Sequence, residues 1–170
     1  MLSVICPIYN EEKYIRQCID SILSQDYPYN DLEVLFVDGM STDCTRAIVT
    51  EYTKQYSHIQ LIDNPHKIVP CAMNIGIHAS KGNIIIRLDA HASYQPDYFS
   101  VLYRYSCELR VENVGVVCKT DVLNKTPKTL AIREVLSNKF GVGNSAFRTG
   151  INQIMEVDTV PFGCWPRSVF

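Results

Sequence analysis

Apolar residues follow two alternating patterns over the first ninety positions of the chain: short continuous apolar runs, and longer segments in which apolar residues recur at helical spacing. Between two of the apolar runs, apolar residues recur at i, i+3, i+4, i+7 and i+8 from Ile15 to Leu23, which is the spacing of one helix face. Strands that alternate with single helices favour parallel pairing through right-handed crossovers. The pattern therefore predicts an open α/β sheet. The short runs rich in Ile, Val and Leu predict strands at residues 3–6, 33–38, 58–63 and 83–89.

Capping residues and breakers place the helices between these strands. Asn10 is the predicted N-cap of the first helix, and Glu11 and Glu12 stand in its first turn, where the helix dipole favours acids. A second helix is predicted to start within residues 41–43 and run towards residue 56. A third helix is predicted from near Pro70 to residue 79.

Beyond Pro96 the pattern is looser. No internal repeat or low-complexity linker interrupts the chain, so residues 1–170 are predicted to form a single domain. The elements expected here are a helix to about residue 110, a strand at 114–120, a helix at 128–138 and a strand at 155–160.

Composition and charge exclude several classes of protein. A net charge of −2 argues against a nucleic-acid binder, and no apolar run approaches the 18 or so residues of a membrane span. The N-terminal segment lacks a basic region and breaks at Pro7, which predicts that it is no signal peptide. Seven cysteines without a C-x-x-C pair favour reduced thiols and a cytoplasmic protein.

Basic residues are concentrated in the last third of the chain. Residues 119–170 contain seven Lys and Arg against four acids, whereas residues 1–118 contain nine against fourteen. Such a surplus fits either an anionic acceptor or membrane surface, or only a solvated face. Both interpretations stay open at this point.

Candidate chemistry gathers where the predicted strands end, and ligands of open α/β sheets bind beyond the carboxyl ends of the strands. Asp89 and His91 lie two residues apart, so they can share one divalent ion that bridges two phosphates. Asp38 is a candidate to accept a hydrogen bond from the imide N–H of a nucleobase, and Tyr9 is a candidate to place its ring against that base. The alternatives are a turn cap at Asp89, a surface imidazole at His91, an Asp-Gly turn at Asp38 and core packing at Tyr9.

Common nucleotide and hydrolase motifs are absent. The chain has no G-x-G-x-x-G, no G-x-x-x-x-G-K-[ST] and no G-x-S-x-G. A nucleotide would therefore be held by side chains and metal.

Three stretches in this order resemble the family 2 glycosyltransferases, which are inverting enzymes of GT-A fold that use nucleotide-diphosphate sugars. They are VICPIYNEEKYIRQCIDSILSQDYP, EVLFVDGMSTDCT and AMNIGIHASKGNIIIRLDAH, and the resemblance covers residues 2–98. The later stretches FGVGNSAFRTG and VDTVPFGCWPRSVF are similar to the succinoglycan-type exopolysaccharide subgroup, in which the D-x-D position is written D-A-H.

The resemblance implies roles for particular residues. Asp38 would pair with the base, usually uracil, and Asp89 would contact the ribose and metal side of the donor. His91 takes the place of the D-x-D residue that ligates Mn²⁺ or Mg²⁺, although imidazole suits softer ions than Mg²⁺. The remaining donor-side residues implied by the family are Pro7, Tyr9 and Glu11 around the nucleoside, with Asn74 and Lys67 as looser matches.

The resemblance also implies direct displacement at the anomeric carbon, with a carboxylate base for the acceptor hydroxyl. In the family this base follows the segment that matches VDTVPFG, but no acidic pair follows Trp165 here, and Asp158 is expected to face solvent. The base is therefore expected beyond Phe170, in a longer enzyme of which this chain would bind nucleotide but transfer sugar poorly.

The implied acceptor is a saccharide or lipid-linked saccharide in cell-surface or exopolysaccharide synthesis. The expected location is the cytoplasm or the cytoplasmic face of the inner membrane, with peripheral membrane association of the full-length protein. Two alternatives are a non-catalytic nucleotide-binding module and a nucleotidyltransferase. The second would show a glycine-rich basic loop after the first strand, where this chain has the acidic PIYNEE.

Overall fold

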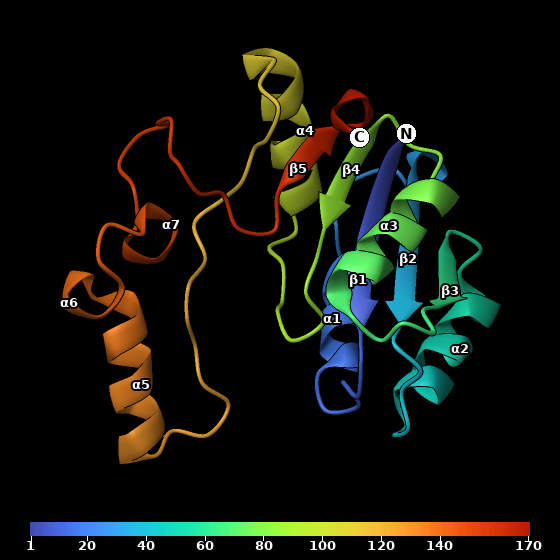
Figure 1. Cartoon of the computed structure of the whole chain (residues 1–170), viewed down its shortest axis with the longest axis horizontal. Coiled ribbons are helices and arrows are strands. Elements are labelled where there is room, and N and C mark those ends of the chain that lie inside the picture. Colours follow the sequence, from blue (N-terminus) through green and yellow to red (C-terminus); the bar gives the residue numbers. More distant parts are fainter. The chain divides into compact units, whose positions relative to one another are not determined.

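The computed structural model describes all residues from 1 to 170, and it contains one five-stranded sheet (Figure 1). The spatial order of the strands is β3-β2-β1-β4-β5. The first four strands pair in parallel, and β5 is antiparallel to β4. This arrangement confirms the predicted α/β class. The strands are β1 (Leu2–Ile8), β2 (Leu32–Asp38), β3 (Ile59–Asp63), β4 (Ile84–Arg87) and β5 (Cys164–Pro166).

Helices connect the strands as the periodicity predicts. The four helices that follow β1 to β4 are α1 (Ile15–Leu23), α2 (Thr45–Gln55), α3 (Val69–Ala79) and α4 (Tyr98–Leu109). They are followed by α5 (Pro127–Ser137) and by two single-turn helices, α6 (Lys139–Val142) and α7 (Ala146–Thr149). Two short 3₁₀ turns lie at Tyr29–Asp31 and Arg167–Val169. None of the helices is both long enough and apolar enough to span a bilayer.

The chain divides into two compact units. The first contains residues 1–114 and 162–170, and therefore the whole sheet with α1 to α4. The second contains residues 115–161 and the helices α5, α6 and α7. The organisation of residues 1–170 as a single domain stays a prediction.

The core of the first unit forms between the sheet and α3. Ile5, Leu35 and Ile85 are fully buried and pack with Ala72 of α3. A Cβ at Gly76 would lie 2.5 Å from Cγ2 of Ile5, so glycine allows α3 to approach β1 closely. As a result α3 lies over β1 and β2, and its first turn stands beside the carboxyl ends of these strands (Figure 1).

A buried carboxylate joins the amino ends of β1 and β2, at the far end of the strands from α3's first turn. The Ser3 hydroxyl donates to Oε1 of Glu33 at 2.5 Å, and the backbone N–H groups of Lys81 and Gly82 donate to the same oxygen. Because these donors compensate the charge, Glu33 stands buried within β2 and fixes the turn that leads into β4.

The prediction that Asn10 caps the first helix is wrong. The residue before α1 is Tyr14, which makes no side-chain cap, so Glu11 and Glu12 precede the helix and do not stand in its first turn as predicted. Asn10 has a left-handed φ of 55°. Its Oδ1 accepts a hydrogen bond from the backbone N–H of Thr42 at 2.8 Å. The amide therefore caps the neighbouring loop rather than its own helix.

The two strands predicted at 114–120 and 155–160 are also wrong. Of these residues only Val114 makes a bridge, to Cys164, and the strand on the free edge of β4 is β5. Alternation of apolar and polar residues does not by itself make a strand, because a strand also needs hydrogen bonds to the backbone of another strand. The N–H of Cys118, for example, donates to the carbonyl of Phe147 in the second unit.

Candidate functional site

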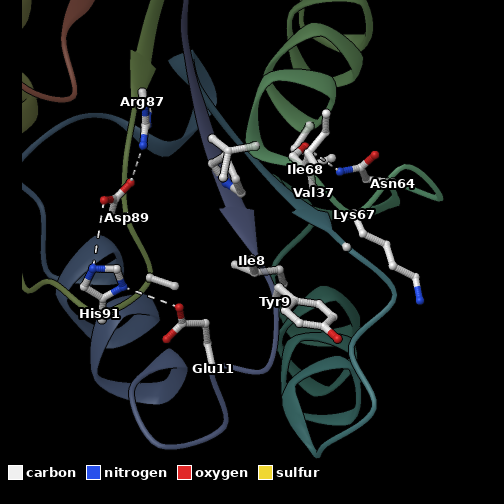
Figure 2. A pocket seen from close by; sticks show the side chains of 15 residues that line it. Ile8, Tyr9, Glu11, Val37, Asn64, Lys67, Ile68, Arg87, Asp89 and His91 are labelled. Carbon is white, nitrogen blue, oxygen red and sulfur yellow. Dashed lines mark hydrogen bonds and ion pairs between the residues drawn. The ribbon is translucent and has the colours of Figure 1, made fainter.

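A pocket of about 160 Å³ lies in the first unit, where β1, β2 and β4 end and α3 begins (Figure 2). Its volume is below the range of roughly 300–1,000 Å³ that is usual for whole small-molecule sites, so it accommodates part of a ligand. Ile8, Val37 and Ala72 give it an apolar lining. The sequence-predicted residues that line it are Pro7, Tyr9, Glu11, Lys67, Asp89 and His91.

His91 stands between two carboxylates at the end of β4 (Figure 2). Its Nε2 lies 4.0 Å from Oδ2 of Asp89, and its Nδ1 lies 3.4 Å from Oε1 of Glu11. The imidazole is largely exposed, whereas both carboxylates are mostly covered by protein. Residues from the ends of β1 and β4 therefore meet as the sequence predicts.

The donor set of Asp89 and His91 fits a divalent cation. A carboxylate oxygen and an imidazole nitrogen are both ligands of divalent ions, and the two donor atoms are 4.0 Å apart, so a small approach of the exposed imidazole would let them share one ion. The structure contains no cluster of three or more His, Cys, Asp or Glu side chains arranged to hold a metal. An ion at this pair would complete its coordination with phosphate oxygens and water, which is the usual situation of Mg²⁺ at nucleotides.

Arg87 belongs to this site, although the sequence analysis did not single it out. Its Nη2 donates to Oδ1 of Asp89 at 3.2 Å, and its guanidinium carbon lies 5.9 Å from the centre of the Phe162 ring. The Nε atom is buried and has no hydrogen-bond partner. The sequence does contain a signal for Arg87. It precedes Asp89 by two residues at the end of the predicted strand 83–89, and residues i and i+2 of a strand share one face.

Tyr94 holds the backbone of Asp89. Its phenolic oxygen accepts a hydrogen bond from the N–H of Asp89 at 2.9 Å and donates one to the carbonyl of the same residue at 2.9 Å. Burial raises the pKa of Tyr94 far above its usual value, so the phenol stays protonated. The turn that carries the Asp89 carboxylate is fixed from behind by this side chain.

Asp38 does not line the pocket. Its carboxylate is fully buried and accepts hydrogen bonds from the backbone N–H of Ser41 at 3.0 Å, from its hydroxyl at 2.5 Å and from Nη1 of Arg46 at 2.6 Å. A nucleobase could pair with Asp38 only by replacing one of these donors. Its role in base recognition stays a prediction.

The loops after β1 and β2 are joined by reciprocal hydrogen bonds. The backbone N–H of Asn10 donates to the Ser41 hydroxyl at 2.9 Å, and that of Glu11 donates to Oγ1 of Thr45 at 2.7 Å. Tyr9 lies on the same loop, and its ring contacts Gly39, where an added Cβ would be 3.3 Å from Cδ2. The loop therefore presents an exposed aromatic ring beside the pocket.

The loop before α3 is built around a buried amide. Asn64 Nδ2 donates to the carbonyl of Ile68 at 3.0 Å, and its Oδ1 accepts from the N–H of His66 at 3.2 Å. This holds Lys67, which has a left-handed φ of 61°, at the pocket wall. Asn74 is exposed on α3 and is not part of the pocket lining, so its predicted donor contact stays a prediction.

The mostly parallel sheet, its flanking helices and the acid–imidazole pair after β4 define a protein of the GT-A class. The family model described as "Glycosyl transferase family 2" matches residues 3–170, and the chain belongs to this family. The resemblance stated from the sequence is thereby confirmed.

Two curated relatives are similar to most of the chain. One, from Methanococcus voltae, is dolichyl N-acetyl-alpha-D-glucosaminyl phosphate 3-beta-D-2,3-diacetamido-2,3-dideoxy-beta-D-glucuronosyltransferase, 29% identical over 86% of this chain and 47% of its own length. The other is the succinoglycan biosynthesis protein ExoA of Rhizobium meliloti, 29% identical over 86% of this chain and 44% of its own length. The chain thus spans less than half the length of these relatives.

Two solved structures show the same fold with bound donors. S. aureus TarS 1-349 in complex with UDP-GlcNAc is 25% identical, with a TM-score of 0.64, and the match covers 74% of this chain and 36% of TarS. The mannosyltransferase PcManGT from Pyrobaculum calidifontis, in complex with GDP-Man and Mn²⁺, is 27% identical. Its TM-score is also 0.64, with 78% of this chain and 37% of PcManGT covered.

Proposed function

We propose that this chain carries the donor half of an inverting glycosyltransferase site. The enzyme would move a sugar from a nucleotide-diphosphate sugar, UDP-linked in our proposal, to a saccharide or lipid-linked saccharide. The observation that best supports this proposal is that Asp89, His91 and Glu11 lie together in one pocket beside the exposed ring of Tyr9. Family membership and the UDP-GlcNAc complex of a related structure support the choice of substrate class.

In this proposal the pocket residues divide the donor between them. The ring of Tyr9 lies against the base, and Pro7 completes the nucleoside side of the pocket. Lys67 and Arg87 place two cations at the pocket wall, where the diphosphate would lie. Asp89 and His91 would hold Mn²⁺ or Mg²⁺, which supplies charge neutralisation at the departing diphosphate.

The catalytic base is proposed to come from outside this pocket. Glu11 and Asp89 are its only carboxylates. Glu11 faces His91, and Asp89 is bonded to Arg87. Both carboxylates therefore serve the donor in our proposal, and neither is free to take a proton from an acceptor hydroxyl.

The cellular setting follows from the curated relatives rather than from the pocket. The Rhizobium protein takes part in succinoglycan biosynthesis, and the Methanococcus enzyme acts on a dolichyl phosphate-linked sugar by its name. We propose that this chain acts in cell-surface or exopolysaccharide synthesis at the cytoplasmic face of a membrane.

Calorimetric titration with UDP tests the donor site. We expect UDP to bind more tightly than GDP and to bind more tightly with Mn²⁺ than without it. His91→Ala should remove most of the Mn²⁺ effect, whereas His78→Ala, at an exposed position outside the pocket, should leave it unchanged. Binding of neither nucleotide, or an Mn²⁺ effect that survives His91→Ala, would contradict the proposal.

A further inference from the structure

Asp89 divides its two carboxylate oxygens between a cation of the protein and the proposed ion site. Its Oδ1 accepts a hydrogen bond from Nη2 of Arg87 at 3.2 Å, whereas its Oδ2 faces Nε2 of His91 at 4.0 Å (Figure 2). An ion shared with His91 would therefore meet Oδ2, while Arg87 occupies the other oxygen. Arg87 thus fixes the side chain of Asp89, as Tyr94 fixes its backbone.

Arg87 is itself held in place by the sheet and by the segment beside it. It is the last residue of β4 and pairs with Ile5 of β1. Its backbone N–H donates to the carbonyl of Gly163 at 3.2 Å, and its guanidinium carbon lies 5.9 Å from the centre of the Phe162 ring. Gly163 has a φ of 69°, and an added Cβ would lie 2.2 Å from the indole of Trp165, so this approach to β4 requires glycine. The guanidinium is therefore carried by a fixed part of the fold.

A contribution to stability alone does not account for this arrangement. Nε of Arg87 is buried without a partner, although buried polar side-chain atoms usually have one. The bond to Asp89 joins two partly exposed side chains, and exposed ion pairs add little stability. What the bond does determine is the direction of a carboxylate that lines the pocket.

We propose that Arg87 is a positioning residue, which orients Asp89 so that Oδ2 is presented to the divalent ion. This inference rests on the proposed function and adds a role to the contact of Arg87 with the diphosphate. Groups that hydrogen-bond to metal-ligating side chains typically contribute about 10–100-fold to metal affinity. The positive charge of Arg87 acts in the opposite direction by repelling the ion, but solvent screens this repulsion because the guanidinium is partly exposed.

Titration of UDP in Mn²⁺ and in EDTA separates the two roles of Arg87. The Mn²⁺ enhancement is the ratio of the UDP affinities under these two conditions. A residue that contacted only the diphosphate would, on substitution, weaken UDP binding equally in both and leave the ratio unchanged. We expect Arg87→Gln to lose most of the enhancement, with a loss of about tenfold in the affinity of the UDP complex for Mn²⁺, measured by electron paramagnetic resonance.

Arg87→Lys keeps the charge but not the planar fork of donors. It should retain more of the UDP affinity in EDTA than Arg87→Gln does, and it should still lose most of the Mn²⁺ enhancement. Arg104→Gln is the matched control, because Arg104 is an exposed arginine of α4 outside the pocket, and its enhancement should equal that of the original chain. All three variants should keep the circular dichroism spectrum of the original chain.

The outcomes distinguish this inference from the proposed function on which it rests. An Mn²⁺ enhancement that is unchanged or larger in both Arg87 variants would overturn the positioning role and leave the donor site in place. No UDP binding, or no Mn²⁺ enhancement, in the original chain would overturn the proposed function and this inference with it.

Discussion

Nη1 of Arg46 lies 2.6 Å from Oδ2 of the fully buried Asp38 and is the charged partner of that carboxylate. The same nitrogen lies 2.8 Å from Oδ1 of Asp63, so α2 is tied to the ends of both β2 and β3. The two aspartates raise the pKa of Arg46, mainly through the hydrogen bond that the guanidinium donates to Asp38. This ion pair supports the loop after β2, which is hydrogen-bonded to the loop after β1.

Removal of this guanidinium should destabilise the fold. In Arg46→Leu the buried Asp38 keeps its Ser41 donors but loses its counter-charge, so we expect a loss of about 1–3 kcal/mol in the free energy of unfolding. Urea denaturation measures it. Arg16→Leu is the control, because Arg16 and Glu51 form a solvent-exposed pair whose loss should change the stability little. Equal losses in the two variants would contradict the importance of the Asp38 pair.

The imidazole at position 91 should set the metal preference of the site. Carboxylate oxygens suit Mg²⁺ better than imidazole does, so His91→Asp should shift UDP binding from a Mn²⁺ preference towards Mg²⁺. Titrations of UDP with each ion, on the original chain and the variant, give the two affinity ratios. If the ratio of Mn²⁺ to Mg²⁺ affinity is the same in both proteins, His91 does not ligate the ion.

The phenol of Tyr94 should matter for both stability and donor binding. Tyr94→Phe removes the partner of the Asp89 N–H and carbonyl, and an unsatisfied buried group costs about 1–3 kcal/mol. We expect a lower free energy of unfolding and several-fold weaker UDP binding in the presence of Mn²⁺. Tyr103→Phe, at an exposed position of α4, is the control. Unchanged UDP affinity in Tyr94→Phe would show that Asp89 does not depend on this support.

Local sequence signals predicted the strands and the pocket residues that follow them directly. The apolar runs before Asp38 and Asp89 predict carboxylates near strand ends. In the structure Asp38 is the last residue of β2 and Asp89 lies two residues beyond β4, but only Asp89 lines the pocket. Arg46 and Tyr94 were missed because their partners come from packing between separate elements. The bond from Arg46 to Asp38 exists only once α2 lies beside β2.

The edge of the sheet was mispredicted for a related reason. Cys164–Pro166 is only three residues long and includes a proline, so it has no strand signal. It nevertheless pairs with β4, and its proline is tolerated because β5 lies at the edge of the sheet. The better-alternating segment at 155–160 makes no backbone hydrogen bonds to another strand and stays irregular. Pairing partners, unlike periodicity, are not visible in a local stretch of sequence.

His58 should make the first unit less stable in mild acid. Its ring stacks on Tyr29 with centres 4.8 Å apart and meets the edge of Tyr56 at 6.0 Å, and its Nε2 is buried without a partner. Burial lowers the pKa of His58 below its ordinary value of 6.5, so the unfolded chain binds the proton more readily than the folded one. Stability that is fully present above pH 6.5 is therefore lost as the pH falls through the lower pKa of the folded state.

His58→Phe keeps an aromatic ring between the two tyrosines but cannot take up a proton. Urea denaturation at neutral and mildly acidic pH should show a smaller loss of stability for this variant than for the original chain. His78→Phe, which replaces an exposed histidine of α3, should behave like the original chain. Because all three proteins contain the same carboxylates, the difference between them isolates the contribution of His58. Parallel pH profiles for all three would show that its protonation does not affect folding.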